Sequence, residues 1–312
     1  MNKKCLYCYK EISEENNFSN FHYKCSKEFF GEKEPPSIEY TLNKMEELAK
    51  EVVARSIAVT GVQPKLSMSV FSENKENRLT IVGALGGKYI FKPPNKEFRE
   101  MPANEHITMR LAEKYGISTV PSSLIKLKSG ELSYITKRID RNGSDQKIHM
   151  LDMFQILEAF DKYKGSMEKI GKALSSFSSH RGLDKIRLFE ITLFSFLTGN
   201  NDMHLKNFSM INFNDSWQLS PAYDLLNVAI INPKDKEELA LTLEGKKKNF
   251  NKAHFIKFGE NLGLGEKQIK STFKKFSKNK AKAIEMIRNS FLSKELQKEY
   301  TSLLEERYSR IE

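Results

Sequence analysis

Two polar side chains that can do chemistry, Asp202 and Asn207, lie five positions apart in one loop near the middle of the chain. An aspartate carboxylate can accept a proton, and an asparagine oxygen can bind a metal ion. The preceding stretch, Leu188–Leu197, is apolar almost all round, which predicts a buried helix. Gly199 suits the position just past the end of that helix. The sequence therefore predicts a reactive loop that is fixed on a buried support.

A second acid, Asp224, follows in the apolar stretch 220–226. Asp-x-x-x-x-Asn is the spacing of the protein-kinase catalytic loop, in which the Asp accepts a hydroxyl proton and the Asn holds a metal ion. Protein-bound Mg²⁺ usually takes a few oxygen ligands together with substrate phosphates. Asn207 and Asp224 are therefore the candidate Mg²⁺ ligands, and Asp202 is the candidate base. Taken singly, either acid more often caps a helix or a turn, but their order after a buried helix favours phosphoryl transfer.

A lysine, Lys92, ends the expected strand 88–92 just before a proline pair. A lysine at a strand end that contacts bound phosphate, and that pairs with a helix glutamate, is the protein-kinase arrangement. Glu105, near the start of an expected helix at 102–115, is the candidate partner of Lys92. The same residues are also compatible with a solvated lysine beside a turn and with an acid that interacts with the helix dipole.

The first 34 residues contain Cys5-x-x-Cys8 followed by His22-x-x-Cys25. Three thiolates and one imidazole form a Cys₃His set, which suits tetrahedral zinc. An odd number of cysteines argues against a disulfide framework. The segment is either a zinc site or a metal-free aromatic appendage with reduced cysteines, and the sequence leaves both open. Nearby phenylalanines are expected to form a small core, namely Phe18, Phe21, Phe29 and Phe30.

Strand patterns dominate the chain up to about residue 148, and helical patterns dominate after it. This order predicts an α+β fold with a strand-rich first lobe, a helical second lobe and a nucleotide in the cleft. The predicted division is a Cys/His segment at 1–34, the first lobe at 35–148 and the second at 149–312. Strands are expected at 66–71, 79–82, 88–92, 122–126 and 132–137, and helices at 41–54, 102–115, 150–160, 167–177, 184–197 and within 251–312.

The composition is that of a soluble globular protein of 312 residues, with 39% hydrophobic and 29% charged residues. A net charge of +11 favours acidic partners such as nucleic acid or a phosphorylated ligand. No apolar stretch reaches the length of a membrane span, and no signal peptide opens the chain. We therefore expect a cytoplasmic location and no membrane partner.

Five motifs, taken in this order along the chain, resemble the HipA-like serine/threonine kinase toxins over residues 50–310. The resemblance implies a two-lobe, protein-kinase-like fold and transfer of the ATP γ-phosphate to a protein hydroxyl, with Mg²⁺. The motifs are Thr60-Gly61-Val62-Gln63-Pro64-Lys65, Phe91-Lys92-Pro93, Lys137-Arg138-Ile139-Asp140-Arg141, Asn201-Asp202-Met203-His204-Leu205-Lys206-Asn207-Phe208-Ser209 and Leu219-Ser220-Pro221-Ala222-Tyr223-Asp224-Leu225.

The resemblance also implies a role for each matching position. Asp202 is then the catalytic base, Asn207 and Asp224 bind Mg²⁺, and Lys92 contacts the ATP phosphates. The remaining implied nucleotide contacts are the backbone around Lys137 and Ile139 at the adenine, His204 and Tyr223 beside the nucleotide, and a phosphate-covering loop with Thr60, Gly61, Val62, Gln63 and Lys65.

Members of this family phosphorylate a serine just before the loop, one or three positions ahead of its glycine. Those positions here are Thr60 and Ala58, so Thr60 is the expected autophosphorylation site and Ser56 is the reserve. A phosphate on Thr60 would add negative charge where the ATP phosphates must sit. We therefore expect autophosphorylation to eject the loop and to inhibit the enzyme.

Only about 60 residues precede the loop motif, which is similar to the short HipT-type kinases of three-gene toxin–antitoxin systems. That resemblance implies two protein partners, a HipS-like small antitoxin and a HipB-like helix-turn-helix protein, with DNA contacted only through the complex. It also implies an aminoacyl-tRNA synthetase as the substrate, glutamyl or tryptophanyl, and inhibition of translation.

Two other functions remain open from the sequence. The first is a basic nucleic-acid-binding module, with a zinc knuckle on an inactive kinase-like scaffold, which would use the Cys₃His set and the +11 charge. That alternative does not require Lys92, Asp202 or Asp224, whose joint presence disfavours it. The second is a kinase for a small molecule, which the motifs exclude poorly.

Overall fold

The computed structural model describes residues 3–12, 20–55, 65–73, 76–82, 86–95, 97–143 and 146–312. Contacts within the chain group it into two compact units. Unit 1 contains Met1–His106 and Val120–Arg141, and unit 2 contains Ile107–Thr119 and Asn142–Glu312. The first 34 residues thus group with the strand-rich part, and the three-part division expected from the sequence stays a prediction.

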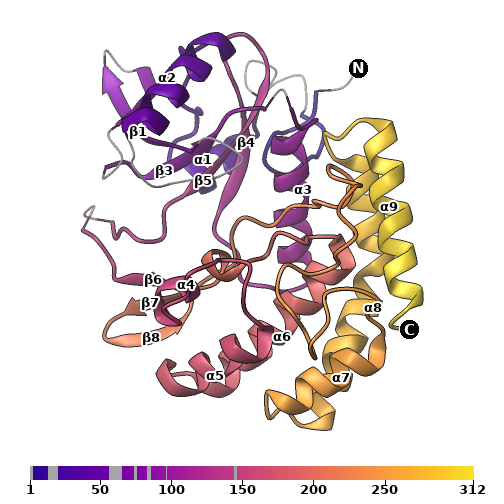
Figure 1. The fold of residues 1–312 in the computed structure, drawn as a ribbon. Helices are drawn as coiled ribbons and strands as arrows, with labels where there is room; N and C mark the ends of the chain where they lie inside the picture. The colour runs from indigo at the N-terminus through magenta and orange to yellow at the C-terminus, as the bar shows by residue number, and fades with distance from the viewer. Residues whose placement is uncertain are drawn as a thin grey trace. The chain divides into compact units, whose positions relative to one another are not determined.

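Unit 1 is built on a five-stranded antiparallel sheet with the order β2-β1-β3-β5-β4 (Figure 1). The central strand β3 is short and mostly buried, and Phe91 within it is fully buried. Its neighbours hold it in register, with Leu66 opposite Phe91 on one side and Tyr134 opposite Lys92 on the other. The predicted strand positions are confirmed. The strands are β1 Leu66–Glu73, β2 Glu76–Ile81, β3 Tyr89–Lys92, β4 Ser122–Lys126 and β5 Leu132–Lys137.

Two helices, α1 (Tyr23–Phe30) and α2 (Leu42–Arg55), precede this sheet in the chain. Aromatic rings pack around α1, with ring centroids 4.8 Å apart for Phe29 and Phe30 and 5.8 Å apart for Phe29 and Tyr89. Phe21 and Phe29 are fully buried or nearly so. The expected aromatic core is thus formed by three of its four members, while Phe18 lies outside the described residues.

A third helix, α3 (Met101–Lys114), has its first six residues in unit 1 and the rest in unit 2. Gly116 follows it with a φ of +76°, a conformation that glycine adopts at no steric cost. The helices predicted at 41–54 and 102–115 are confirmed by α2 and α3.

Unit 2 is mainly helical, with a small antiparallel sheet of order β6-β7-β8 (Figure 1). Its central helix, α6 (Arg181–Thr198), buries every residue from Ile191 to Thr198, as the apolar sequence predicts. No helix in the described part of the chain is both long enough and apolar enough to cross a membrane. The other elements are β6 Met150–Asp152, α4 Met153–Ile156, α5 Met167–Phe177, η2 Leu205–Asn207, β7 Ser209–Phe213, β8 Ser216–Leu219, α7 Lys252–Asn261, α8 Glu266–Asn289 and α9 Lys294–Ser309.

The helix predicted at 150–160 is wrong. Residues 150–152 form strand β6, which pairs with β7 and places Asp152 opposite Ser209. Asp152 then caps the single turn α4 through a reciprocal capping box with Gln155. Strand pairing with a segment almost 60 positions later overrides the local helical spacing, because local periodicity carries no information about distant partners. The other predicted helices of unit 2 are confirmed.

Candidate active site

The loop that carries Asp202 begins where α6 ends. Gly199 adopts a φ of +68°, and the Asn200 amide donates to the Ser195 carbonyl at 2.8 Å, which closes the helix. The Gly199 carbonyl accepts hydrogen bonds from the amides of Val228 and Ala229, both at 3.0 Å. The loop is thus tied both to α6 and to the segment that follows Asp224.

Asp202 is half-buried, and its carboxylate accepts a 2.7 Å hydrogen bond from the Tyr163 hydroxyl. Its backbone carbonyl accepts two more hydrogen bonds, from the His204 amide at 2.8 Å and from Asn207 Nδ2 at 3.0 Å. The peptide is therefore held firmly, while the carboxylate keeps acceptor sites beyond the one that Tyr163 occupies. Such a group can take up a proton from a hydroxyl.

The donor set of the loop suits a hard cation. Because Asn207 Nδ2 donates to the Asp202 carbonyl, the Oδ1 atom of Asn207 is the amide atom available as a ligand. The carboxylate of Asp224 belongs to the same unit. Oxygen donors of these two kinds are the ligands that Mg²⁺ takes in proteins.

Asp224 has a φ of +60°, which is uncommon for a residue with a side chain. The chain on either side fixes this conformation. The Ala222 amide donates to the Ser118 carbonyl at 2.8 Å, and the Ile230 amide donates to Asn227 Oδ1 at 3.2 Å. Strained residues that their surroundings hold in place concentrate at functional sites, which fits the expected role of Asp224.

His204 is nearly buried at 6% exposure, and its ring packs edge-on against Tyr163 with centroids 5.1 Å apart. Burial lowers the pKa of His204, and the negative charges of Asp202 and Asp224 oppose that effect. The imidazole therefore lies in the field of both carboxylates. Its Nδ1 atom is buried without a hydrogen-bond partner among the described residues.

Tyr223 supports the same loop from the other side. Its hydroxyl donates to the Lys206 carbonyl at 3.0 Å and also bonds to Ser209 Oγ. Burial raises the pKa of Tyr223, so its hydroxyl stays protonated as a donor. The structure thus gives Tyr223 a positioning contact next to Asn207.

In unit 1, Lys92 and Glu105 form a buried ion pair. Lys92 Nζ lies 2.6 Å from Glu105 Oε1, and the two side chains are 5% and 2% exposed. The Lys92 ammonium also lies over the Tyr134 ring at 5.4 Å. A buried charge is tolerated when it is paired in this way, so the strand-end lysine is held in one position by the helix glutamate.

The expected adenine-binding strand end is also ordered. The Lys137 amide donates to the Pro121 carbonyl at 2.9 Å, and Lys137 Nζ reaches the Glu28 carbonyl at 3.3 Å. Burial lowers the pKa of Lys137, against the opposing charge of Glu28. Ile139 is half-buried. Arg138 holds Asp140 through two hydrogen bonds, Nε to Oδ1 at 2.9 Å and Nη2 to Oδ2 at 2.6 Å.

Most of the predicted phosphate-covering loop lies outside the residues that the structure describes. Lys65 is exposed just before β1. The other predicted residues of this loop, Thr60, Gly61, Val62 and Gln63, lie outside the described residues, and so does Ser56.

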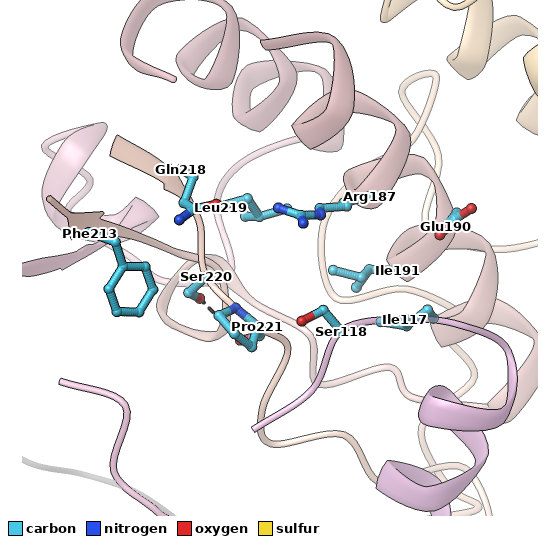
Figure 2. Close-up of a pocket in the computed structure, with 10 residues that line it drawn as sticks. All are labelled: Ile117, Ser118, Arg187, Glu190, Ile191, Phe213, Gln218, Leu219, Ser220 and Pro221. Carbon is cyan, nitrogen blue, oxygen red and sulfur yellow. Dashed lines mark hydrogen bonds between the residues drawn. The ribbon is translucent and has the colours of Figure 1, made fainter. Parts of the chain in front are cut away.

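A small cavity of about 90 Å³ lies beside the Ser220-Pro221 step (Figure 2). Arg187 and Ile191 of α6 line it together with Ser118. It is too small for a nucleotide, since ligand pockets are usually about 300 Å³ or more, and none of the predicted catalytic or metal residues lines it. We assign it no role in catalysis.

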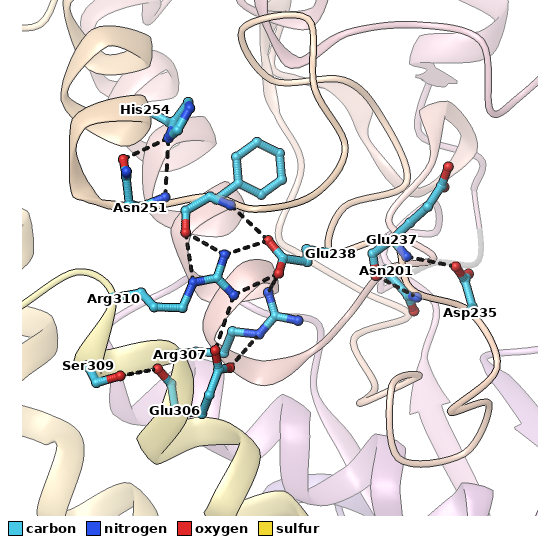
Figure 3. Close-up of polar contacts among 11 residues, drawn as sticks. Asn201, Asp235, Glu237, Glu238, Asn251, His254, Glu306, Arg307, Ser309 and Arg310 are labelled. Atoms are coloured by element: carbon cyan, nitrogen blue, oxygen red, sulfur yellow. Dashed lines mark hydrogen bonds and ion pairs between the residues drawn. The ribbon is translucent and has the colours of Figure 1, made fainter.

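Sequence reasoning missed a buried charge network that supports the loop (Figure 3). Glu238 accepts a hydrogen bond from Arg310 Nη1 at 2.7 Å and lies 2.9 Å from Arg307 Nη1. Burial raises the pKa of Glu238, but hydrogen bonds from Arg310 and the Phe250 amide outweigh it and leave the pKa below its ordinary value.

The residue before Glu238 connects this network to the loop, because the Glu237 carbonyl accepts from Asn201 Nδ2 at 3.1 Å (Figure 3). Helix α9, more than 100 positions away, thus helps to place the residue next to Asp202. Tyr163 was missed as well. Neither contact has a local sequence signal, because each joins residues that are far apart in the chain.

The four predicted zinc ligands come together in unit 1. The ligand atoms of Cys5, Cys8, His22 and Cys25 all lie within 4.8 Å of one another. Hydrogen bonds from the Cys25 and Cys8 thiols lower the pKa of the Cys5 thiol. In the part of the chain that the structure describes, no other group of three or more His, Cys, Asp or Glu residues is arranged to hold a metal ion.

The family model described as the HipA-like C-terminal domain matches residues 57–284. A protein named as a kinase from Haemophilus influenzae is 28% identical over 69% of this chain and 70% of its own length. A second, from Sinorhizobium fredii, is 30% identical over 70% of this chain and 57% of its own length. The serine/threonine-protein kinase toxin HipA of Shewanella oneidensis is 28% identical over 55% of this chain, which spans 43% of that protein.

Solved structures match the fold. The Shewanella oneidensis HipA, HipB and operator DNA complex contains a chain that superposes with a TM-score of 0.68 at 21% identity, covering 84% of this chain and 70% of that one. The Helicobacter pylori kinase CtkA superposes with a TM-score of 0.51 at 15% identity, covering 78% of this chain and 90% of that one. The predicted fold class, α+β and protein-kinase-like, is confirmed.

Proposed function

The chain belongs to the family defined by the HipA-like C-terminal domain, and from that premise we propose that it is an ATP-dependent protein kinase. One observation carries the proposal. The loop after α6 presents the half-buried carboxylate of Asp202, whose peptide is bound by Asn207 at 3.0 Å. That is the residue pair, spacing and mutual support that a phosphoryl-transfer loop needs.

In the proposed mechanism, Asp202 orients the acceptor hydroxyl and takes its proton. Asn207 Oδ1 and the Asp224 carboxylate are the groups that would hold Mg²⁺, which, when bound, offsets the negative charge of the transferring phosphate. Lys92, kept in place by Glu105 at 2.6 Å, is the candidate phosphate contact of unit 1. Tyr163 and Tyr223 keep the loop in its working conformation through the hydrogen bonds described above.

We extend the proposal to the acceptor and the partners. The acceptor is a serine or threonine hydroxyl of a protein, because the similar Shewanella protein carries that name. A HipB-like helix-turn-helix partner, with DNA contacted through it, is supported by the similar complex of HipA, HipB and operator DNA. A toxin role is supported by the name of the similar Shewanella protein. A HipS-like antitoxin, an aminoacyl-tRNA synthetase substrate and autophosphorylation at Thr60 rest on the family resemblance alone. We also propose the cytoplasmic location expected from the sequence.

Transfer of labelled phosphate from ATP, with and without Mg²⁺, tests the proposal directly. We expect the wild-type protein to become labelled, with the phosphate mapped by mass spectrometry to Thr60 or Ser56. The Asp202→Asn protein should transfer at least about a hundredfold more slowly, the usual contribution of a positioned base. Asp215→Asn is the matched control, because Asp215 is an exposed aspartate of the same unit.

Two results would count against this assignment. Equal labelling in wild type and Asp202→Asn would remove Asp202 from the mechanism. Absence of labelling in dephosphorylated wild-type protein, together with salt-dependent binding of nucleic acid, would favour the alternative of a nucleic-acid-binding module on an inactive scaffold.

A further inference from the structure

The segment that precedes the kinase-like region brings four possible zinc ligands together, and their ligand atoms all lie within 4.8 Å of one another. His22 Nδ1 lies 3.4 Å from Cys8 Sγ and 3.8 Å from Cys25 Sγ. A zinc ion with Zn–S bonds of about 2.3 Å and Zn–N bonds of about 2.0–2.1 Å separates its sulfur and nitrogen ligands by roughly 3.5 Å in a tetrahedron. Each of these two distances differs from that separation by no more than a few tenths of an ångström.

The first ligand pair lies on a tight turn. The Tyr9 amide donates to the Cys5 carbonyl at 3.0 Å, and the Cys5 amide donates to the Lys10 carbonyl at 2.9 Å. Tyr9 has a φ of +65°, an uncommon conformation for a residue with a side chain. The turn directs both thiols of Cys5-x-x-Cys8 to one point, and a backbone that is strained in this way needs an interaction that holds it.

The second pair comes from the start of α1. His22 is the residue before the helix and Cys25 lies in its first turn. His22 Nε2 lies 3.0 Å from the Glu11 carbonyl, which can only accept a hydrogen bond, so Nε2 carries the proton. The Nδ1 lone pair then faces the thiols. A metal-bound histidine usually donates its second ring nitrogen to a carbonyl or carboxylate in this manner.

We propose that Cys5, Cys8, His22 and Cys25 bind one structural Zn²⁺ ion. Four protein ligands leave no open position, so the ion does not take part in catalysis. Thiolate and imidazole ligands select zinc or another soft metal over Mg²⁺, Ca²⁺ or Mn²⁺. This site is separate from the proposed Mg²⁺ ligands, which are oxygen atoms of unit 2, and it does not depend on the proposed kinase activity.

The contacts of the segment indicate what the ion stabilises. The Tyr9 hydroxyl bonds to His106 Nδ1 at 2.8 Å in a buried position, and His106 is the neighbour of Glu105 in α3. The Glu28 carbonyl accepts from Lys137 Nζ. A segment of about 30 residues cannot bury enough apolar surface to fold alone. Zinc therefore fixes a small module that contacts the chain next to both the Lys92–Glu105 pair and the end of β5.

Metal analysis of the full-length protein, purified under reducing conditions, tests the site. We expect one zinc per chain by mass spectrometry of the metals, and we expect reduced, metal-free protein to bind Co²⁺ with the absorption spectrum of a tetrahedral thiolate site. His22→Gln and Cys25→Ser should each lower the zinc content at least tenfold. His180→Gln, a change at an exposed histidine, is the control and should keep one zinc.

Two outcomes would overturn the proposal. One is wild-type protein that contains no zinc after growth with added zinc and whose reduced form does not bind Co²⁺. The other is full zinc content in both His22→Gln and Cys25→Ser. Because the first outcome is measured on wild-type protein, poor folding of a variant cannot decide the question.

Thermal unfolding checks the structural role separately. Removal of the metal with a chelator should lower the Tm of the wild-type protein by several degrees, because bound metal stabilises the folded state. The same treatment should leave the Tm of Cys25→Ser unchanged. An unchanged wild-type Tm after complete removal of zinc would contradict a structural role.

Discussion

The ion pair of unit 1 and the loop of unit 2 hold their charged groups in opposite ways. Lys92 and Glu105 are almost completely buried, and each is the partner of the other at 2.6 Å. Asp202 is only half-buried, and its carboxylate accepts from the neutral hydroxyl of Tyr163. In unit 1 the Lys92 ammonium is held in place by the negative charge of Glu105. In unit 2 hydrogen bonds hold the Asp202 backbone in place, and the Asp202 carboxylate keeps acceptor sites for a hydroxyl proton.

This difference matches the two roles that we propose. A residue that only has to present a fixed positive charge to phosphate gains from a rigid, buried pair, because the partner glutamate sets its position. A residue that has to take up a proton must keep an unoccupied acceptor site. The two regions should therefore respond differently to substitution, the first mainly in stability and the second mainly in rate.

The largest expected effect is a loss of folding stability in Lys92→Met. This substitution removes the positive charge that Glu105 pairs with in a buried position, and breaking a buried ion pair typically costs about 3–5 kcal/mol of unfolding free energy. Urea unfolding measures the change. The double variant Lys92→Met/Glu105→Leu should recover most of the stability, because it removes both charges, but not the phosphate transfer.

A matched control is available for this pair. Lys128 and Glu39 form an ion pair at 3.0 Å, but with side chains 60% and 50% exposed. Lys128→Met should change stability little, because solvent screens exposed pairs. Equal losses of stability in Lys92→Met and Lys128→Met would show that burial is not what distinguishes the two pairs.

The next largest effect is expected from Asp224→Asn, this time in rate. Asparagine tolerates the φ of +60° at this position, so the fold should persist while one negative ligand is lost. We expect a fall of about 10²–10³-fold in phosphate transfer and a higher Mg²⁺ requirement. The control is Asp215→Asn, which makes the same change at a residue that also has a φ of +60°. A normal Mg²⁺ dependence in Asp224→Asn would exclude Asp224 as a metal ligand.

A smaller change in rate is expected from Tyr163→Phe. This substitution removes the hydroxyl that donates to Asp202 at 2.7 Å and keeps the ring that packs on His204. We expect kcat to fall about tenfold, the value of roughly one hydrogen bond to a charged group, with little change in Tm. Tyr23→Phe changes an exposed tyrosine of unit 1 and should have no effect on kcat. An unchanged kcat in Tyr163→Phe would mean that the carboxylate does not need this contact.

The smallest expected effect is a change in how folding stability depends on pH in His204→Gln. Burial lowers the pKa of His204 below its ordinary value of 6.5, so the folded state takes up this proton at a lower pH than the unfolded chain does. The contribution of neutral His204 to stability is therefore fully present above pH 6.5 and is lost as the pH falls through its lowered pKa. Unfolding measured above and below pH 6.5 should show a shallower pH dependence in His204→Gln. An unchanged slope in His204→Gln would show that this histidine does not cause the pH dependence of stability.

Much of the site could be foreseen from single stretches of sequence. The buried helix before the loop, the strand that ends in Lys92 and the Cys₃His set each follow from residue types at fixed spacing. In these cases the signal is local, because hydrophobic periodicity and short ligand spacings are set by the geometry of one helix, strand or turn.

What the sequence by itself determined is therefore the type of each element and the identity of the reactive residues. Only the tertiary structure decided which distant residues support them. The Tyr163 hydroxyl donates to Asp202, and Arg307 of helix α9 pairs with Glu238 next to the residue that Asn201 contacts. Pairing with β7 makes residues 150–152 a strand instead of a helix. These contacts join positions tens to more than a hundred residues apart. No local pattern encodes them, because their free energy is gained only when the two segments meet in the folded chain.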